Sequence, residues 1–198
     1  MTELSLCLDR HGLEHLYALI GEKWKLFGGG ALSDWLTAIS LFISTDGHEV
    51  TVTGEVEYLD FEREDETYSR LQVSSGAGGR GKAAAAGYPY YHHQGEEVTD
   101  VRILRETVSE FIDGARTWTL TTDIAIVFVL ESGVIAVARV NYHSELLCVV
   151  QARTVQDLVV DQLLSSWTNL VDRTYEFERR MIPVSELLGM DKDSSRES

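Results

Sequence analysis

A glycine-rich stretch, residues 76–83, carries the clearest chemical pattern in the sequence. It matches the phosphate-binding pattern G-x-x-x-x-G-K, except that Ala83 stands where a Ser or Thr should hold magnesium. In such loops successive backbone N–H groups surround one phosphate, and the lysine reaches the terminal phosphates. A phosphorylated ligand would therefore contact Gly76, Gly79, Arg80, Gly81 and Lys82.

The sequence after this stretch argues against a working nucleotide site. The pattern needs a helix whose N-terminus faces the phosphate, but only one turn of alanines separates Lys82 from Gly87, and Pro89 follows. An isolated helix of that length is not stable in water. Because glycine and alanine are typical of flexible connections, the sequence favours a flexible loop over residues 75–97. Phosphate binding is the alternative hypothesis.

The strongest compositional feature is an excess of acidic residues. Thirty-two acidic and 17 basic residues give a formal net charge of -15, which repels nucleic-acid backbones and anionic membrane surfaces. Seven acids fall within twelve residues that hold Arg63 as their only cation: Glu55, Glu57, Asp60, Glu62, Glu64, Asp65 and Glu66. We expect this cluster to attract a basic protein partner. The alternative is a solvated edge strand whose charges maintain solubility.

Tyrosines and histidines follow the glycine-rich stretch. Tyr88, Tyr90 and Tyr91 offer a partner large contact area at low entropic cost, so we expect them to contribute to the partner-binding surface. His92 and His93 could ligate a metal. The sequence, however, has no second pair of ligands at a recognised spacing, so neither a metal nor a cofactor is predicted.

Motifs for nucleophilic or metal-dependent hydrolysis do not occur in the sequence. Cys148 and His143 come nearest to a nucleophile with its base, but their odd spacing on one strand would point the side chains to opposite faces. There is no G-x-S-x-G elbow and no His-Glu-x-x-His stretch. The sequence therefore favours a non-catalytic protein over an enzyme.

Two tight hairpins are expected to form much of a sheet, with turns at Asp46-Gly47 and Ser132-Gly133. The first turn would join strands over residues 36–44 and 50–58, and the second would join strands over residues 119–130 and 134–142. The apolar centre of residues 119–130 indicates burial on both faces. Further strands are expected over residues 68–73, 146–151 and 174–182.

Three helices are expected where apolar residues recur at helical spacing. They cover residues 13–27 after an Asp9 N-cap, residues 101–112 before Gly114, and residues 154–173 beginning at Thr154. Together these elements predict an α+β fold, in which a mostly antiparallel sheet of about six strands carries three helices. Each hairpin follows a helix, so two duplicated helix-hairpin units are possible, although chance similarity of two apolar hairpins is the simpler explanation.

One domain over residues 1–190 is expected, with residues 191–198 as a frayed polar tail. Residues 1–9 lack the basic start and apolar centre of a signal peptide, and the longest apolar run, residues 124–130, is too short to span a membrane. We therefore expect a cytoplasmic protein without direct contacts to membrane or nucleic acid. The function that best fits is a non-catalytic module that binds a basic protein, as an inhibitor or immunity-type protein does. The alternatives are a phosphate-loop protein and a structural homo-oligomer whose hairpins pair across a two-fold axis.

Overall fold

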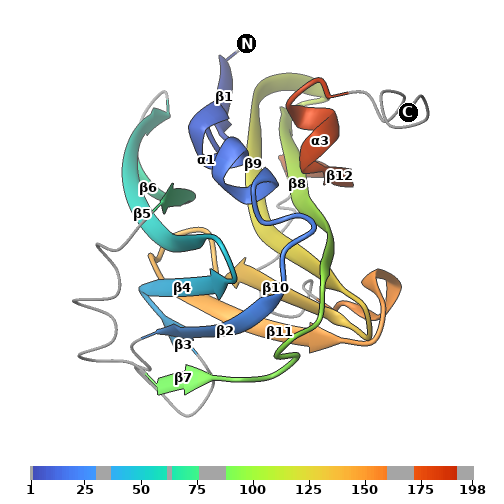
Figure 1. The fold of residues 1–198 in the computed structure, drawn as a ribbon. Coiled ribbons are helices and arrows are strands. Elements are labelled where there is room, and N and C mark those ends of the chain that lie inside the picture. The colour runs from blue at the N-terminus through green and yellow to red at the C-terminus, as the bar shows by residue number, and fades with distance from the viewer. Residues whose placement is uncertain (1, 30–36, 62–63, 76–87, 160–171, 191–198) are drawn as a thin grey trace.

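A computed structural model describes residues 2–29, 37–61, 64–75, 88–159 and 172–190 (Figure 1). In these ranges the chain forms a seven-stranded and a five-stranded sheet, together with two short α-helices. The predicted α+β fold with three helices on one sheet is wrong, because the protein is mostly β. No helix in the described ranges is long and apolar enough to cross a membrane.

The seven-stranded sheet is built around one long strand, β9. Its order is β12-β8-β9-β10-β11-β3, with β1 as an additional neighbour of β9. The strands are β1 (Thr2–Leu6), β3 (Thr37–Ala38), β8 (Val98–Ile112), β9 (Ala115–Leu130), β10 (Val134–Arg139), β11 (Leu147–Ala152) and β12 (Arg173–Pro183). One edge of β9 pairs with β8 along its length. The other edge is shared, since β1 runs parallel to residues 118–122 and β10 runs antiparallel to residues 125–129.

The five-stranded sheet has the order β6-β5-β4-β2-β7. Its strands are β2 (Trp24–Gly29), β4 (Ser40–Thr45), β5 (Glu49–Phe61), β6 (Glu64–Ser75) and β7 (Tyr88–Tyr90). The predicted hairpin at Asp46-Gly47 is confirmed, because β4 and β5 pair antiparallel on either side of it. Strands β5 and β6 form a second, longer hairpin that rises beside β1 and the helix α1 (Arg10–Tyr17) (Figure 1).

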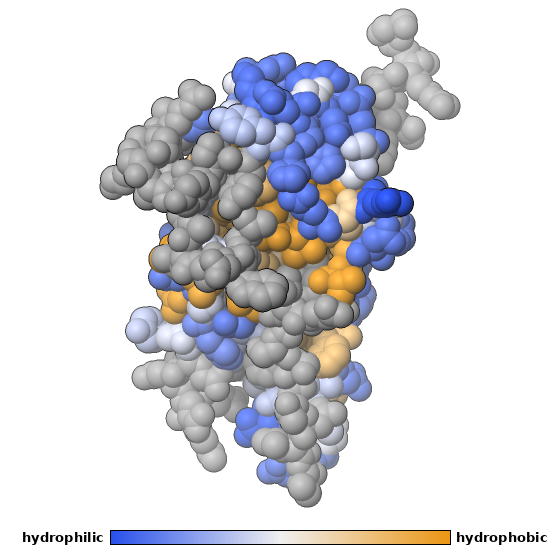
Figure 2. Space-filling view, turned by 90° about the horizontal axis from the view of Figure 1, so that it is seen from below, coloured by the Kyte–Doolittle hydropathy of each residue, from blue (hydrophilic) through white to orange (hydrophobic). Residues whose placement is uncertain are grey.

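An apolar core lies between the two sheets. Trp24 and Phe27 of β2 meet Phe128 of β9, and the Trp24 and Phe128 ring centroids are 5.5 Å apart. Leu13 and Leu16 of α1 join the same core. On the face shown in Figure 2, apolar side chains show in the middle, while hydrophilic side chains gather toward the ends. The apolar side chains between the two sheets are removed from water, and this burial is the main force that holds the sheets together.

The first predicted helix is about half as long as expected. Its N-cap is confirmed, because Asp9 Oδ1 accepts a hydrogen bond of 2.7 Å from Gly12 N. The helix ends at Tyr17, and Gly21, with φ of +86°, lies in the following turn. Trp24 and Phe27 lie on strand β2 rather than on the helix. Their three-residue spacing suits a helix, but on β2 a register shift between Trp24 and Leu26 turns both toward the core.

The second predicted helix, residues 101–112, is strand β8. Its alternation is interrupted by a bulge between Leu104 and Arg105, and Glu106 and Glu110 occupy buried positions where apolar residues would be expected. A search for apolar periodicity therefore misses the strand. Asp113 and Gly114, with φ of 50° and 77°, form the tight hairpin turn to β9. The idea of two duplicated helix-hairpin units is wrong for the same reason.

The third predicted helix does not form at its expected start. Thr154 Oγ1 donates a hydrogen bond of 2.8 Å to Asp157, but only one turn of 3-10 helix, Val155–Asp157, follows. Leu158 is extended, with φ of -67° and ψ of 118°, so the helix cannot continue. Residues 160–171 and the predicted tail, 191–198, lie outside the described residues. The predicted last strand is confirmed as β12, and a short helix α3 (Val184–Leu187) follows it.

Candidate functional site

The acidic cluster lies on the outer half of the β5–β6 hairpin. Cross-strand pairs join Glu55 to Arg70, Leu59 to Glu66, Asp60 to Asp65 and Phe61 to Glu64. We call residues 55–61 and 64–70 the acidic hairpin. The tertiary structure thus brings Glu55, Glu57, Asp60, Glu64, Asp65 and Glu66 onto two adjacent strands, while Glu62 lies outside the described residues.

One arginine partly neutralises the inner end of the acidic hairpin. Arg70 Nη2 lies 3.6 Å from Glu55 Oε2, and Arg70 Nη1 lies 3.3 Å from Glu57 Oε2. Gln72 also donates a hydrogen bond to Glu55. These pairs are exposed, so solvent screens them and each contributes little to stability. Residues 55–61 and 64–70, the part of this hairpin that the structure describes, contain six acidic residues and one arginine, so they are strongly negative.

Apolar side chains on the acidic hairpin are also exposed to solvent. Tyr58 is 78% exposed and Val56 is 38% exposed. Both alternate with Glu55 and Glu57 along β5 and therefore lie on the opposite face of the strand. An exposed tyrosine next to an acidic surface suits an anchor in a protein interface, because its ring gives contact area and its hydroxyl a hydrogen bond.

The tyrosine segment lies at the other edge of the same sheet. Residues 88–90 form β7, which pairs with β2 through Tyr90 to Phe27 and Tyr88 to Gly29. Three strands separate β7 from β6, so the backbone places Tyr88 and Tyr90 at the opposite edge of the sheet from the acidic residues of β6. Tyr91 is 57% exposed. The pairing of β7 and the turn after it correct the expectation of a flexible loop for residues 88–97.

The glycine-rich stretch with Gly76, Gly79, Arg80, Gly81 and Lys82 lies outside the described residues. The structure therefore does not test phosphate binding. The homo-oligomer hypothesis, in which the apolar hairpins pair across a two-fold axis with Tyr88 to Tyr91 at the interface, also stays a prediction. In the structure these hairpins bury their apolar side chains within the chain, as Ile43, Val52 and Ile135 show with exposures of 0%.

His93 helps to hold a hairpin turn. Its Nδ1 lies 2.9 Å from Glu96 Oε1 and 3.3 Å from Ser132 Oγ. Ser132 Oγ and Ser132 N also donate to the two oxygens of Glu96, at 2.7 and 2.9 Å. A catalytic triad needs the serine and the carboxylate on different ring nitrogens, but here both contact Nδ1. The cluster therefore stabilises the β9–β10 turn through hydrogen bonds. Among the described residues, no group of three or more possible metal ligands occurs.

Neither cysteine is placed as an activated nucleophile. Cys148 is buried in β11, and burial raises the pKa of its thiol to about 11. His143 lies exposed in the β10–β11 connection, where its Nδ1 is 2.8 Å from Thr67 O. Burial, together with Asp123, also raises the pKa of Cys7. Both thiols are thus protonated at neutral pH.

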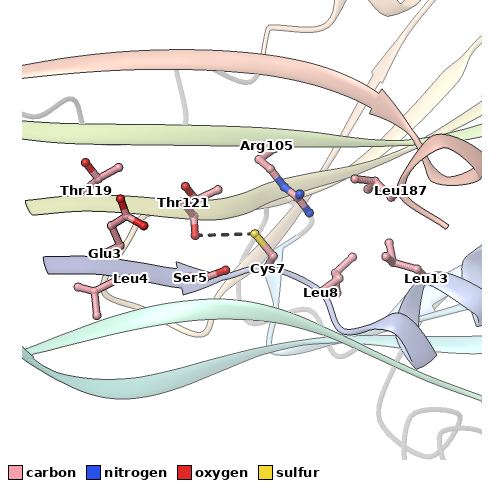
Figure 3. Close-up of a pocket in the computed structure, with 10 residues that line it drawn as sticks. All are labelled: Glu3, Leu4, Ser5, Cys7, Leu8, Leu13, Arg105, Thr119, Thr121 and Leu187. Atoms are coloured by element: carbon pink, nitrogen blue, oxygen red, sulfur yellow. Dashed lines mark hydrogen bonds between the residues drawn. The ribbon is translucent and has the colours of Figure 1, made fainter. Parts of the chain in front are cut away.

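A polar groove lies over β1, β9 and β8, and no sequence motif predicts it. Its volume is about 680 Å³. Figure 3 shows the residues that line it: Glu3, Leu4, Ser5, Cys7, Leu8, Leu13, Arg105, Thr119, Thr121 and Leu187. The floor is rich in hydroxyl groups, and leucines from α1 and α3 stand at one end. The residues come from opposite ends of the chain, because β1 pairs with a strand more than 110 residues away.

Arg105 is held at this groove by a buried carboxylate. Its Nε donates to Asp123 Oδ1 at 2.7 Å and its Nη2 donates to Asp123 Oδ2 at 3.1 Å. Asp123 is 0% exposed and also accepts a hydrogen bond of 2.8 Å from Leu8 N. The hydrogen bonds that Arg105 donates to Asp123 raise the pKa of Arg105. The guanidinium group is therefore permanently charged and fixed in orientation.

Comparison with known proteins places no relative beside this chain. No family model matches it, and no curated protein and no solved structure matches it either. The class defined by the fold and the surface is a two-sheet β protein with an acidic hairpin and a polar groove.

Proposed function

We propose that this protein is a non-catalytic module that binds a basic protein partner through the acidic hairpin. The observation that supports this most directly is Tyr58, which is 78% exposed on a strand that also carries Glu55, Glu57 and Asp60. The exposed ring is available to a partner, and its position beside a negative surface suits an anchor for a basic protein.

Charge and anchor would act at different steps of binding. The net charge of -15 and the acids on the hairpin attract a basic partner over a distance of about a Debye length, which raises the association rate. Tyr58 would then be buried, and it could receive a lysine or arginine side chain on its ring face. Burial of an aromatic anchor mainly slows dissociation.

An inhibitor or immunity-type protein of the cytoplasm would use a surface of this kind, because it must capture a basic toxin or nuclease rapidly. The absence of recognised catalytic motifs from the sequence supports a binding role. The groove and the hairpin are formed by different strands, so the proposal does not depend on any ligand of the groove.

Binding kinetics test this proposal. The immobilised protein would capture its partner from cell extract. The purified pair would then be measured by surface plasmon resonance from 20 to 500 mM salt, a range over which the Debye length falls about fivefold. We expect the triple substitution Glu64→Gln, Asp65→Asn, Glu66→Gln to slow association about tenfold at low salt and to flatten the salt dependence. We expect Tyr58→Ala to accelerate dissociation about tenfold or more.

Glu176 and Glu178 supply the control, because they are exposed acids on β12 in the other sheet. The double substitution Glu176→Gln, Glu178→Gln removes charge at a distance from the acidic hairpin. It should leave dissociation unchanged and slow association only slightly. The proposal fails if the hairpin variants and this control have the same kinetics at every salt concentration.

A further inference from the structure

The polar groove has a regular floor. Cross-strand partners share a face of a sheet, and the groove face carries three rows: Glu3 with Thr119, Ser5 with Thr121, and Arg105 beside Asp123 and Cys7. Successive rows are two residues apart, or about 7 Å. Glu3 and Arg105 therefore mark opposite ends of a floor about 13 Å long along the strands. Figure 3 shows Glu3, Ser5, Thr119, Thr121 and Arg105 on neighbouring strands.

Arg105 has hydrogen-bonding capacity that Asp123 does not use. A guanidinium group carries five N–H donors, and Asp123 takes two of them, one from Nε and one from Nη2. Within the part of the chain that the structure describes, Nη1 makes no hydrogen bond. Arg180, the cross-strand partner of Arg105 on β12, adds a second positive charge to this row. The Arg105 end thus has two cations and one carboxylate.

The opposite end of the floor is negative. Glu3 lies in the first row, and Glu176 on β12 is the cross-strand partner of Ser109 in the same row. The hydroxyl groups between the two ends retain capacity as well. Ser109 and Thr119 share one hydrogen bond of 3.0 Å, and Thr107 and Thr121 share one of 3.3 Å. Each hydroxyl can take part in up to three hydrogen bonds.

An apolar corner adjoins the positive end. Leu8 and Leu13 approach it from the start of α1, and Leu187 approaches it from α3. Cys7 lies next to them as a neutral thiol and donates to Thr121 O at 3.8 Å. The groove therefore offers a fixed cation beside an apolar corner, then hydroxyl groups, and then a carboxylate.

The geometry points to a binding site for a short free peptide with an apolar C-terminal residue. The peptide carboxylate would accept hydrogen bonds from Arg105 Nη1, and the last side chain would pack among Leu8, Leu13 and Leu187. Backbone amides would pair with the hydroxyls of Ser5, Thr119 and Thr121, and the terminal ammonium group would face Glu3. An extended tripeptide spans about 10 Å, which fits a 13 Å floor between side chains that reach inward.

Calorimetric titration of the full chain with four tripeptides tests this site. The probes are Gly-Gly-Leu, its C-terminal amide, its N-acetyl form and Gly-Gly-Gly. We expect Gly-Gly-Leu to bind with a Kd on the order of 1 mM or below, and each of the three altered peptides to bind at least about fivefold more weakly, because each lacks one recognised group. Absence of saturable binding at 20 mM Gly-Gly-Leu, on the order of twenty times that Kd, overturns the proposal. Equal binding of all four peptides overturns it as well.

Variants locate the binding in the groove. Glu3→Gln should weaken Gly-Gly-Leu about fivefold and leave the N-acetyl peptide unchanged, since only the ammonium group contacts Glu3. Leu187→Ala should reduce the difference between Gly-Gly-Leu and Gly-Gly-Gly. Glu14→Gln on the exposed side of α1 is the control and should change neither. If Glu3→Gln weakens both peptides equally, or if the acetylated peptide binds as well as the free one, the ligand is not a free zwitterionic peptide.

Discussion

The two halves of strand β9 lie in opposite kinds of surroundings. Residues 124–128 of the C-terminal half are 0% exposed, and their side chains enter apolar clusters on both faces of the sheet. The N-terminal half pairs with β1 instead of β10, and it contributes Thr119 and Thr121 to the groove, while Asp123 is buried beside Arg105. One continuous strand thus serves as the centre of the core and as the floor of a polar groove.

Charged residues are buried on the other face of the polar half. Glu106 is 1% exposed and pairs with Arg179, while Glu110 is 4% exposed and lies 3.2 Å from Arg173. Arg139 is 0% exposed and donates to Ser69 Oγ at 2.9 Å and to Thr122 Oγ1 at 2.7 Å. Burial lowers the pKa of Arg139 to about 10, which still leaves it charged at neutral pH.

The difference shows two ways to stabilise one sheet. Apolar packing tolerates many sequences, because it depends mainly on volume and area. Buried charges require specific partners, because an unpaired one is costly. We therefore expect the polar half to be more sensitive to small changes of chemistry, and the apolar half to be more sensitive to loss of volume.

The largest expected effect is loss of volume in the apolar half. Phe128→Ala should lower the free energy of unfolding by about 3–5 kcal/mol, because the ring is fully buried against Trp24. Phe111→Ala is the matched change at the far end of β8, where the ring is half-buried, and about 1 kcal/mol is expected there. Urea denaturation measures both. Equal losses would remove the distinction between the two regions.

The next effect is loss of one charge in the polar half without loss of volume. Asp123→Asn should destabilise the protein by about 2–3 kcal/mol, because Arg105 would lose its counter-charge and Leu8 N its charged acceptor. Asp46→Asn is the control, since Asp46 forms an exposed pair of 3.2 Å with Lys25, and less than about 1 kcal/mol is expected. A small loss for Asp123→Asn would mean that buried charge does not organise this half.

The smallest effect concerns acid sensitivity at the end of the apolar half. Burial alone would raise the pKa of Glu96, but hydrogen bonds from Ser132 and His93 lower it below its usual value. A carboxyl group whose pKa is lower in the folded than in the unfolded state stabilises the fold at pH values above its unfolded-state pKa. This stabilisation is lost as the pH falls through the folded-state pKa. Glu96→Gln should therefore cost about 1–2 kcal/mol at pH 7 and less below about pH 4.

Unfolding midpoints of Glu96→Gln and the parent protein between pH 3 and 7 give this comparison, over a range that brackets an ordinary glutamate pKa of about 4.3. Hydrogen exchange of Ser132 N reports the β9–β10 turn directly, because that amide donates to Glu96 Oε2. A constant difference between the two proteins at all pH values would show that the Glu96 carboxylate charge does not hold the turn.

Local signals allowed some parts of this fold to be predicted and not others. The turns at Asp46-Gly47 and Ser132-Gly133 were found because flanking apolar residues made the hairpins evident. Asp113-Gly114 is an equally good turn, but it was read as the end of a helix. The buried Glu106 and Glu110 interrupted the apolar alternation that would have identified β8.

The acidic hairpin and the polar groove also differ in how far the sequence predicts them. The acidic residues are close in sequence, so their shared hairpin could be anticipated, whereas the contacts of Arg70 with Glu55 and Glu57 could not. The groove could not be predicted at all. Its two ends are Glu3 and Arg105, which are about a hundred residues apart, and only the pairing of β1 with β9 brings them together.

The sequence by itself determined the negative charge, the acidic segment, the N-cap at Asp9 and the tight turns, because these depend on composition or on neighbouring residues. Only the tertiary structure decided whether residues 101–112 are helix or strand, and where β1 lies. The physical reason is that both outcomes depend on partners distant in the chain. Burial of Glu106 and Glu110 is tolerable only where Arg179 and Arg173 of β12 reach them.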